Sequence, residues 1–180
     1  MPGIHNVENA VAAIAVAKNI GIPIDKISAA VQTYEGVKRR FDYQVRSGEV
    51  IYIDDYAHHP EELRACISSV KELYPGKKIT GIFQPHLFSR TRDFAEGFSE
   101  SLSLLDELIL LDIYPARELP IEGVTSKIIF DKVNLENKIL CAKENALDEL
   151  KKRNLEVLLT LGAGDIDTLV EPIKNFLIKK

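Results

Sequence analysis

Hydrophobic and polar positions divide the chain into two parts with different patterns. Residues 7–18 are apolar nearly all round, which predicts a helix that must be buried against something else. A second, shorter helix is predicted for residues 23–34, because apolar residues line one face and Pro23 suits the first turn. Residues 35–40 break the pattern and are predicted to form a linker.

Beyond residue 41, short apolar runs alternate with segments of helical periodicity. Residues 43–46 and 50–53 flank a short polar connection, which predicts an antiparallel hairpin. Apolar runs and stripes predict the remaining elements, which are strands at 79–83, 107–111, 139–141 and 157–161, and helices after Pro60, near 91–105 and over 166–177. The alternation predicts an α/β fold of Rossmann-like type, with a mostly parallel sheet, helices on both faces and an antiparallel edge hairpin.

The α/β pattern occupies residues 41–180 and has no need of a helix that is apolar on every face. Residues 1–40 are therefore predicted to belong to a neighbouring domain that is largely absent, so the chain is expected to be truncated. A length of 180 residues fits one domain plus a fragment of another.

Composition narrows the class of protein. The chain is 46% hydrophobic and 28% charged, which is typical of a globular domain. A net charge of −4 provides no overall positive field for nucleic acid or anionic lipid. No apolar run reaches the roughly 20 residues that cross a bilayer, and no signal peptide is apparent. Cys66 and Cys141 form no CxxC pair and are interpreted as reduced packing residues, which favours a cytoplasmic enzyme.

Polar and charged residues collect after four of the predicted strands. The loops are 54–60, 84–90, 112–118 and 162–165, and they hold three of the four histidines. The carboxyl ends of parallel strands lie at one edge of a sheet, where ligands of such folds bind. We expect the functional site at this edge. The connections on the opposite edge, at 74–78 and 151–154, are interpreted as solvated.

Each of these loops also has a purely structural interpretation. The aspartates of 54–55 could cap the next helix, and the histidine pair 58–59 could be one surface and one capping residue. His86 could be structural, and Arg90 could pair with a surface carboxylate. The glycines of 162–164 could form a tight turn or let backbone N–H groups meet an anion.

Three adjacent basic residues, Lys38-Arg39-Arg40, lie in the predicted linker. They could be a solvated run, or their guanidinium groups could reach phosphate in a cleft between domains. The sequence holds no GxxxxGK[ST] phosphate loop, so other parts would have to hold most of a nucleoside triphosphate.

Five stretches together resemble the Mur ligases. They are GIHNVENA (3–10), EGVKRRF (35–41), DDYAHHP (54–60), FQPHLFSRTR (83–92) and GAGDI (162–166). The resemblance implies that residues 1–40 are the last helices of the family's central ATPase domain plus a hinge, and residues 41–180 its C-terminal domain. It also implies a cytoplasmic enzyme of peptidoglycan synthesis that forms an amide bond through an acyl phosphate.

The resemblance further implies ligands and site residues. The substrates would be UDP-N-acetylmuramate, L-alanine and ATP, with Mg²⁺ held mainly by upstream domains, and without nucleic acid or membrane as partners. The residues on the nucleotide side would be Asn6 and Asn9 near the adenine, Arg39 and Arg40 near the phosphates, Asp55 on the ribose and Tyr56 stacked near the adenine.

The same resemblance places His58, His86 and Arg90 in a catalytic pocket for the incoming amino acid. Arg90 would hold the alanine carboxylate, and a neutral histidine would steer or deprotonate the amine. Gly162 and Gly164 would line this pocket, and no residue is assigned as a metal ligand.

Three other functions stay open on the sequence alone. A ligase that recycles a tripeptide onto the same sugar nucleotide shares the linker and DD..HHP features, although His86 and Arg90 favour single alanine. A metal-dependent hydrolase could use Asp54, Asp55, His58, His59 and His86. A non-catalytic interaction domain would bind neither ATP nor alanine. We expect the 180 residues alone to have no ligase activity.

Overall fold

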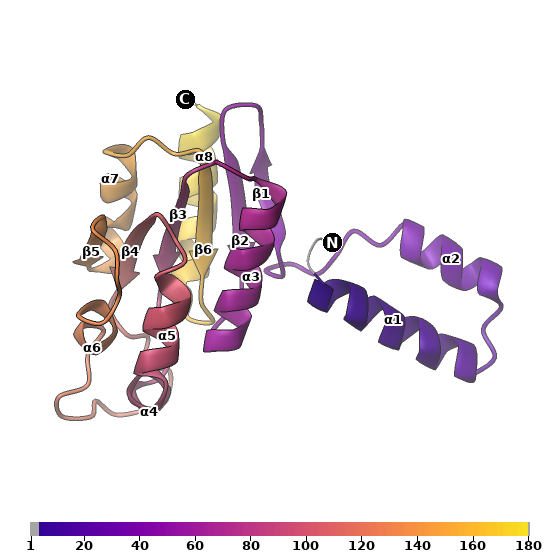
Figure 1. The fold of residues 1–180 in the computed structure, drawn as a ribbon, viewed down its shortest axis with the longest axis horizontal. Helices are drawn as coiled ribbons and strands as arrows, with labels where there is room; N and C mark the ends of the chain where they lie inside the picture. Colours follow the sequence, from indigo (N-terminus) through magenta and orange to yellow (C-terminus); the bar gives the residue numbers. More distant parts are fainter. Residues whose placement is uncertain (1–3, 180) are drawn as a thin grey trace.

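The computed structural model describes residues 4–179, so Gly3 of the GIHNVENA stretch lies outside the described residues. Within this range one six-stranded sheet has the order β1-β2-β6-β3-β4-β5, and only β1 runs antiparallel to its neighbour (Figure 1). The strands are β1 (Asp42–Arg46), β2 (Ile51–Asp55), β3 (Ile79–Phe83), β4 (Glu107–Leu111), β5 (Lys138–Cys141) and β6 (Val157–Leu161). The predicted mostly parallel sheet with an antiparallel edge hairpin is confirmed.

Helices cover both faces of the sheet, as predicted. Successive side chains of a strand point to opposite faces. Ile51 and Ile53 of β2 therefore pack in one buried layer, and Tyr52 packs in the other. The first layer is closed by α3 (Pro60–Leu73), α5 (Ala95–Leu102) and α6 (Lys127–Phe130), and the second by α7 (Ala146–Lys151) and α8 (Val170–Ile178). Two short 3₁₀ turns, Lys143–Asn145 and Asp165–Leu169, precede α7 and α8.

The helical segment after β3 differs from its prediction. One helix was expected near residues 91–105, but the chain forms α4 (Phe88–Asp93) and then α5, with a break at Phe94. Phe94 leaves helical geometry (φ −115°, ψ 18°), and its ring packs against His59 at 4.7 Å between centroids. Sequence periodicity also missed α6 and α7, because four and six residues are too short to show a helical repeat.

The two N-terminal helices, α1 (Ile4–Asn19) and α2 (Ile24–Gln32), form a hairpin that projects from one side of the sheet (Figure 1). In this structure α1 is not covered, since Val11 is 59% and Val16 62% exposed, so its predicted burial against a neighbouring domain stays a prediction. In α2 only Ile27 is buried. Assignment of residues 1–40 to a neighbouring domain stays a prediction. No helix within residues 4–179 is long and apolar enough to span a bilayer.

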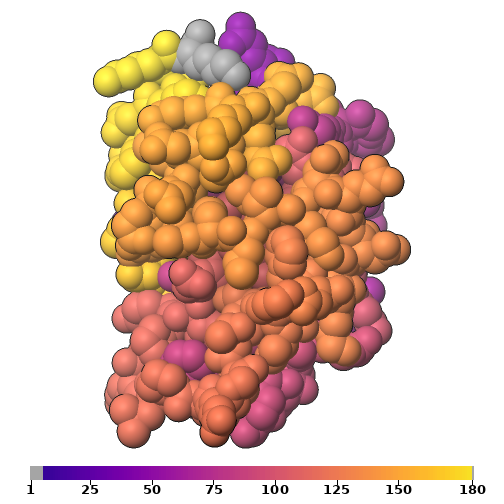
Figure 2. Space-filling view, turned by 90° about the vertical axis from the view of Figure 1, so that its left-hand side faces the viewer, coloured from indigo at the N-terminus to yellow at the C-terminus, as the bar shows by residue number. Residues whose placement is uncertain are grey.

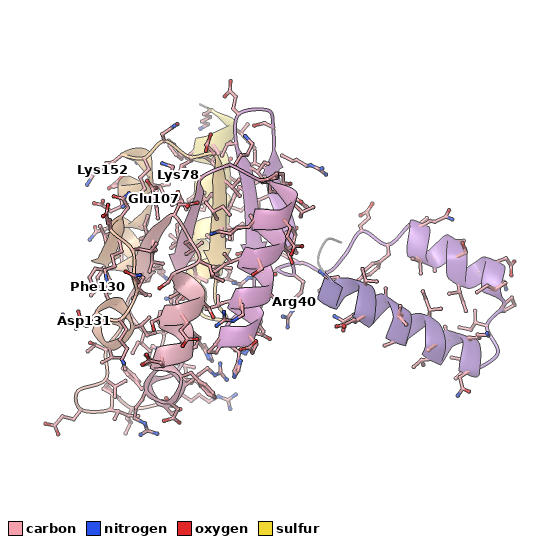
Figure 3. The ribbon with its side chains drawn as sticks, viewed as in Figure 1. Arg40, Lys78, Glu107, Phe130, Asp131 and Lys152 are labelled. Atoms are coloured by element: carbon pink, nitrogen blue, oxygen red, sulfur yellow. The ribbon has the colours of Figure 1, made fainter. Side chains whose placement is uncertain are left out.

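The edge opposite the predicted site is not simply solvated. Glu107, at the start of β4, is buried and accepts hydrogen bonds from Lys78 Nζ (2.9 Å) and Thr80 Oγ1 (2.9 Å), with Arg153 Nη1 at 3.6 Å (Figure 3). The expectation of solvated connections is therefore wrong for Lys78 and Arg153, whose charges pair with Glu107. Seen from the β5 side, the segment that follows β4 covers the lower part of the molecular surface (Figure 2).

Candidate functional site

Four loops meet at the carboxyl edge of the sheet, as the sequence predicts. Asp55 of β2 and Phe83 of β3 both pair with Leu161 of β6, so these three strands end at the same level. β4 lies beside β3 in parallel and ends at the same edge. In Figure 1 this edge lies at the lower end of the sheet, where α4 begins.

Asp54 is a buried structural group. Its Oδ1 accepts from Thr160 Oγ1 (2.6 Å) and its Oδ2 from Arg39 Nε (3.0 Å), and Thr160 in turn contacts the Tyr52 hydroxyl at 3.1 Å. Burial raises the pKa of Asp54, while the Thr160 hydrogen bond and the Arg39 charge act against the rise. A series of hydrogen bonds between side chains therefore runs from Arg39 in the linker to Tyr52 in the sheet.

Asp55 ties the linker to the end of β2. Its Oδ2 accepts from the Phe41 N–H (2.7 Å) and its Oδ1 from the Ala57 N–H (2.8 Å). Burial raises the pKa of Asp55, and these two backbone hydrogen bonds oppose the rise, with a smaller contribution from Arg40. The carboxylate shapes the turn that leads to the histidines.

The two linker arginines have different environments. Arg39 adopts a left-handed conformation (φ 61°), and its Nη2 donates to the Gly162 carbonyl at 2.7 Å, so its side chain is only 15% exposed. The Arg40 side chain is 47% exposed and lies 3.9 Å from Glu62 Oε1. Both guanidinium groups contact the Tyr56 ring, at 5.2 and 5.3 Å from its centroid. Arg40 therefore has the freer cationic group.

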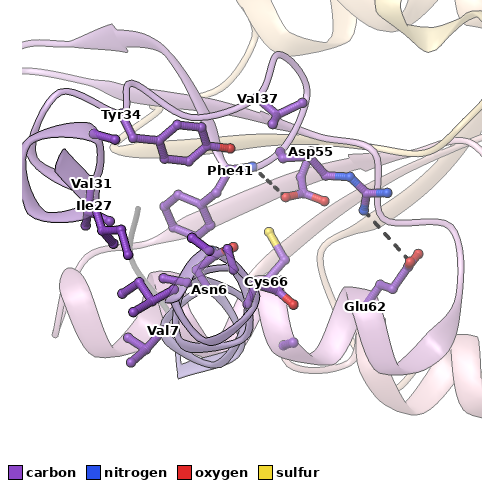
Figure 4. Close-up of a pocket in the computed structure, with 18 of the residues that line it drawn as sticks. Asn6, Val7, Ile27, Val31, Tyr34, Val37, Phe41, Asp55, Glu62 and Cys66 are labelled. Atoms are coloured by element: carbon purple, nitrogen blue, oxygen red, sulfur yellow. Dashed lines mark hydrogen bonds and ion pairs between the residues drawn. The ribbon is translucent and has the colours of Figure 1, made fainter. Parts of the chain in front are cut away.

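A cavity of about 1150 Å³ lies between the helical hairpin, the linker and α3 (Figure 4). Its polar lining includes Asn6, Asn9, Arg40 and Asp55, while α1 and α2 contribute alanine, valine and isoleucine side chains. The structure therefore brings together four of the six residues predicted on the nucleotide side. Arg39 and Tyr56 lie beside this group and are not among the lining residues.

His58 has a defined tautomer. Its Nδ1 lies 3.0 Å from the Tyr56 carbonyl oxygen and 3.3 Å from Glu62 Oε2, and both of these groups accept hydrogen bonds. Nδ1 must therefore carry the proton in the neutral ring, which leaves Nε2 with a basic lone pair. The His58 backbone N–H also donates to Glu62 Oε2 at 2.9 Å, which fixes the base of the loop.

His86 has the opposite tautomer. Its Nδ1 lies 3.4 Å from Arg90 Nη1, and a guanidinium only donates, so Nδ1 accepts and Nε2 carries the proton. Burial, and then the charges of Arg90 and His58, lower the pKa of His86, while Glu118 acts in the other direction. The His86 ring stacks on Tyr114 at 5.7 Å and lies 6.3 Å from His58. The three residues predicted for the amino-acid pocket are therefore together.

His59 and the glycines have structural roles here. His59 caps α3, with Nδ1 accepting from the Glu61 N–H at 3.4 Å. A Cβ added to Gly162 would lie 2.7 Å from the Gln84 carbonyl oxygen, and one on Gly164 would lie 2.7 Å from Tyr114 Cβ. The glycines thus allow close packing between the loops after β6, β3 and β4.

The donor set does not match a metal-dependent hydrolase. Asp54 and Asp55 already accept from protein donors, and His59 is turned to α3. Among the side chains that the structure describes, no group of three or more His, Cys, Asp or Glu residues is arranged to hold a metal ion. Both cysteines are free thiols, and burial raises the pKa of Cys66 well above its usual value.

Sequence reasoning missed two residues that organise the edge. Gln84 Nε2 donates to Asp165 Oδ1 (2.8 Å), and its Oε1 accepts from the Ile166 N–H (2.9 Å). Glu118, in the loop after β4, accepts from the backbone N–H and the hydroxyl of Ser89. The sequence shows that Gln84 directly follows a strand and that Glu118 lies in the loop after another, but their partners lie 29 to 82 residues away.

Residues 39–164 match the model of the family described as Mur ligase, glutamate ligase domain. A UDP-N-acetylmuramate–L-alanine ligase of Parabacteroides distasonis is 58% identical over 175 residues, which are 97% of this chain and 38% of the relative. The enzyme of the same name from Flavobacterium johnsoniae is 53% identical over 177 residues, 98% of this chain and 39% of the relative. The chain thus spans about two fifths of the length of these relatives.

Solved structures resemble the fold along the whole chain. The UDP-N-acetylmuramate-alanine ligase of Thermotoga maritima superposes with a TM-score of 0.78 at 30% identity and covers 100% of this chain and 39% of its own. A murein peptide ligase of Psychrobacter arcticus has a TM-score of 0.69 at 19% identity, over 98% of this chain and 38% of its own, and shows the shared fold alone.

Proposed function

The chain belongs to the Mur ligase family, and from that premise we propose that it forms the part of a UDP-N-acetylmuramate–L-alanine ligase that receives L-alanine and closes one side of the ATP site. The observation that carries this proposal is the convergence of His58, His86 and Arg90, together with the hydrogen bond from His58 to Glu62, a residue that lines the same cavity as Asn6 and Asp55. The identity of 52–58% to curated L-alanine ligases supports this substrate rather than a tripeptide.

The chemistry requires an activated carboxylate and a deprotonated amine. ATP transfers its γ-phosphoryl group to the muramate carboxylate, which yields an acyl phosphate and ADP. The alanine amine then attacks the acyl carbon, the tetrahedral intermediate expels phosphate, and the amine gives up a proton. A protein contributes to such a sequence mainly by alignment and charge stabilisation, together with one proton acceptor.

On the amino-acid side we assign a role to each residue. Arg90 makes one side-chain hydrogen bond among the described residues, so most of its N–H donors are available to bind the alanine carboxylate. His58 is the base, because its Nε2 has the lone pair. His86, kept neutral by burial and by Arg90, presents an Nε2–H that orients the substrate.

On the nucleotide side, Asn6 and Asn9 would recognise the adenine edge through amide groups that both donate and accept. Arg40 would approach the phosphates, whereas Arg39 mainly holds the linker to Asp54 and Gly162. Asp55 and Tyr56 would form the floor near the ribose and the adenine. Mg²⁺ would accompany the phosphates and be held mainly by parts outside residues 4–179, since Asp54 and Asp55 already have partners. UDP-N-acetylmuramate would lie largely outside this range, and the reaction would be cytoplasmic, where ATP is available.

The test uses the full-length ligase that carries this chain. Arg90→Ala should raise the KM for L-alanine tenfold to hundredfold, roughly the worth of a charge-assisted hydrogen-bond pair. The matched control is Arg92→Ala, since Arg92 lies two residues away on the same helix, is exposed and pairs with Asp93. His58→Gln should lower kcat about hundredfold with little change in KM.

Two results would contradict the proposal. Equal KM values for L-alanine in the Arg90 and Arg92 variants would show that Arg90 does not bind the alanine carboxylate. A wild-type enzyme that accepts a tripeptide faster than L-alanine would support the recycling ligase. For the nucleotide side, Arg40→Ala should raise the KM for ATP more than Lys38→Ala does, because Arg40 lines the cavity and Lys38 does not.

A further inference from the structure

The first turn of α4 takes its cap from a distant loop. Leu87 occupies the N-cap position and has no side chain that could accept a hydrogen bond, and its backbone is left-handed (φ 73°). The first N–H groups of a helix need acceptors from elsewhere. Glu118 supplies one, since its Oε2 accepts from the Ser89 N–H at 2.9 Å and its Oε1 accepts from the Ser89 hydroxyl.

The same loop also holds the segment before α4. The Tyr114 N–H donates to the Pro85 carbonyl at 2.8 Å, and the Leu87 N–H donates to the Tyr114 carbonyl at 2.9 Å. The Tyr114 ring stacks on His86 with an interplanar angle of 22°. Residues 114–118 therefore fix both sides of the segment that carries His86 and Arg90.

We propose that Glu118 is a positioning residue that sets the placement of Arg90 and His86 for the amino-acid substrate, and this inference rests on the proposed function. Arg90 directly follows Ser89, whose backbone N–H and hydroxyl donate to Glu118, so a loose first turn of α4 would move its guanidinium. A shift of about 1 Å in a positioning group is enough to cost a large factor in rate or affinity.

The first arm of the test uses the 180-residue chain and NMR. Glu118→Ala should shift the His86 ring protons, because the ring current of Tyr114 changes when the stack loosens, and should make the Arg90 Nε–H more mobile. The matched control is Glu122→Ala, an exposed glutamate in the same loop. Unchanged His86 and Arg90 signals in a folded Glu118→Ala chain would overturn the proposal.

The second arm uses the full-length ligase. Glu118→Ala should raise the KM for L-alanine about tenfold and leave the KM for ATP within twofold. Ser89→Ala should have a smaller effect, because the Ser89 N–H still reaches Glu118. Glu118→Gln, which keeps an acceptor oxygen, should restore part of the affinity. Equal rises in both KM values would indicate a general structural role and contradict the proposal. Absence of alanine-dependent activity in the wild type would instead contradict the proposed function, and the NMR arm would still decide the role of Glu118.

Discussion

The two sides of the carboxyl edge use their charged groups in different ways. On the side of the linker, β2 and β6, the side chains of Asp54, Asp55 and Arg39 are taken up by partners within the chain. On the side of α4, within the described residues, His58 Nε2 has no hydrogen-bond partner and Arg90 makes a single side-chain hydrogen bond.

This difference separates charge that holds the edge in shape from charge that is available to a ligand. A buried charge is tolerated when it is paired and hydrogen-bonded, and it then has little capacity left for a substrate. A half-buried cation with free donors, beside a histidine whose pKa is lowered, is typical of a functional site. The nearby residues of one motif, Asp54 and His58, thus belong to opposite classes.

The largest expected effect concerns the side of the linker, β2 and β6, where the charged groups are paired within the chain. Asp54→Ala should lower the free energy of unfolding of the 180-residue chain by about 3 kcal/mol or more, because it leaves the Arg39 charge and the Thr160 hydroxyl without their buried partner. Urea denaturation followed by circular dichroism measures this change. The control is Asp93→Ala, whose exposed pair with Arg92 should matter little. Similar losses in the two variants would erase the distinction between the two sides.

The next effect tests the packing where the two sides meet. Gly162→Ala and Gly164→Ala should each lower stability by about 2 kcal/mol, because the new Cβ would press on Gln84 or Tyr114. Gly48→Ala is the control, since nothing lies within 4 Å of a Cβ at that position. Wild-type stability in both loop variants, measured by thermal unfolding, would indicate that the glycines serve ligand approach instead.

The sequence predicted the sheet because its strands are continuous apolar runs. Strands β2, β3, β4 and β6 are buried on both faces, so their pattern needs no knowledge of partners. Short helices and the break at Phe94 were missed, because they depend on contacts such as the one between Phe94 and His59. The apolar pattern of α1 has a related limit, since an apolar helix shows only that it needs a partner, not where that partner lies.

For the site, the sequence predicted which loops meet but not which charges are free. Arg39 and Arg40 are adjacent and identical in type, and only the left-handed backbone of Arg39 turns it towards Asp54 and Gly162. The same limit applies to Gly162 and Gly164, because the close approach of Gln84 and Tyr114 is a tertiary feature. The spacing of residues in a motif shows neither which charged groups are paired nor which loops pack closely.

An NMR titration of His86 tests the side of α4, where the charged groups have few partners within the chain. In NMR the His86 imidazole should titrate below its usual value near 6.5, and Arg90→Gln should move its pKa upward, because a neighbouring positive charge is removed. Since the folded pKa lies below the unfolded one, the unfolded chain binds the proton first as the pH falls. The His86 contribution to stability is therefore present above about pH 6.5 and is lost below it. A His86 pKa that does not change in Arg90→Gln would show that the Arg90 charge does not lower the pKa of His86.

The smallest expected effect concerns the loop after β4, which contacts the segment that carries His86 and Arg90. Ala116, between Tyr114 and Glu118, is exposed and left-handed (φ 51°), a conformation that favours glycine. Ala116→Gly should therefore raise the free energy of unfolding by about 0.5 kcal/mol, while Ala65→Gly, inside α3, should lower it by about 1 kcal/mol. Opposite signs in the two variants, measured by urea denaturation, would show that backbone strain at Ala116 lowers the free energy of unfolding of the wild-type chain. Equal losses would mean instead that the Ala116 conformation is relaxed.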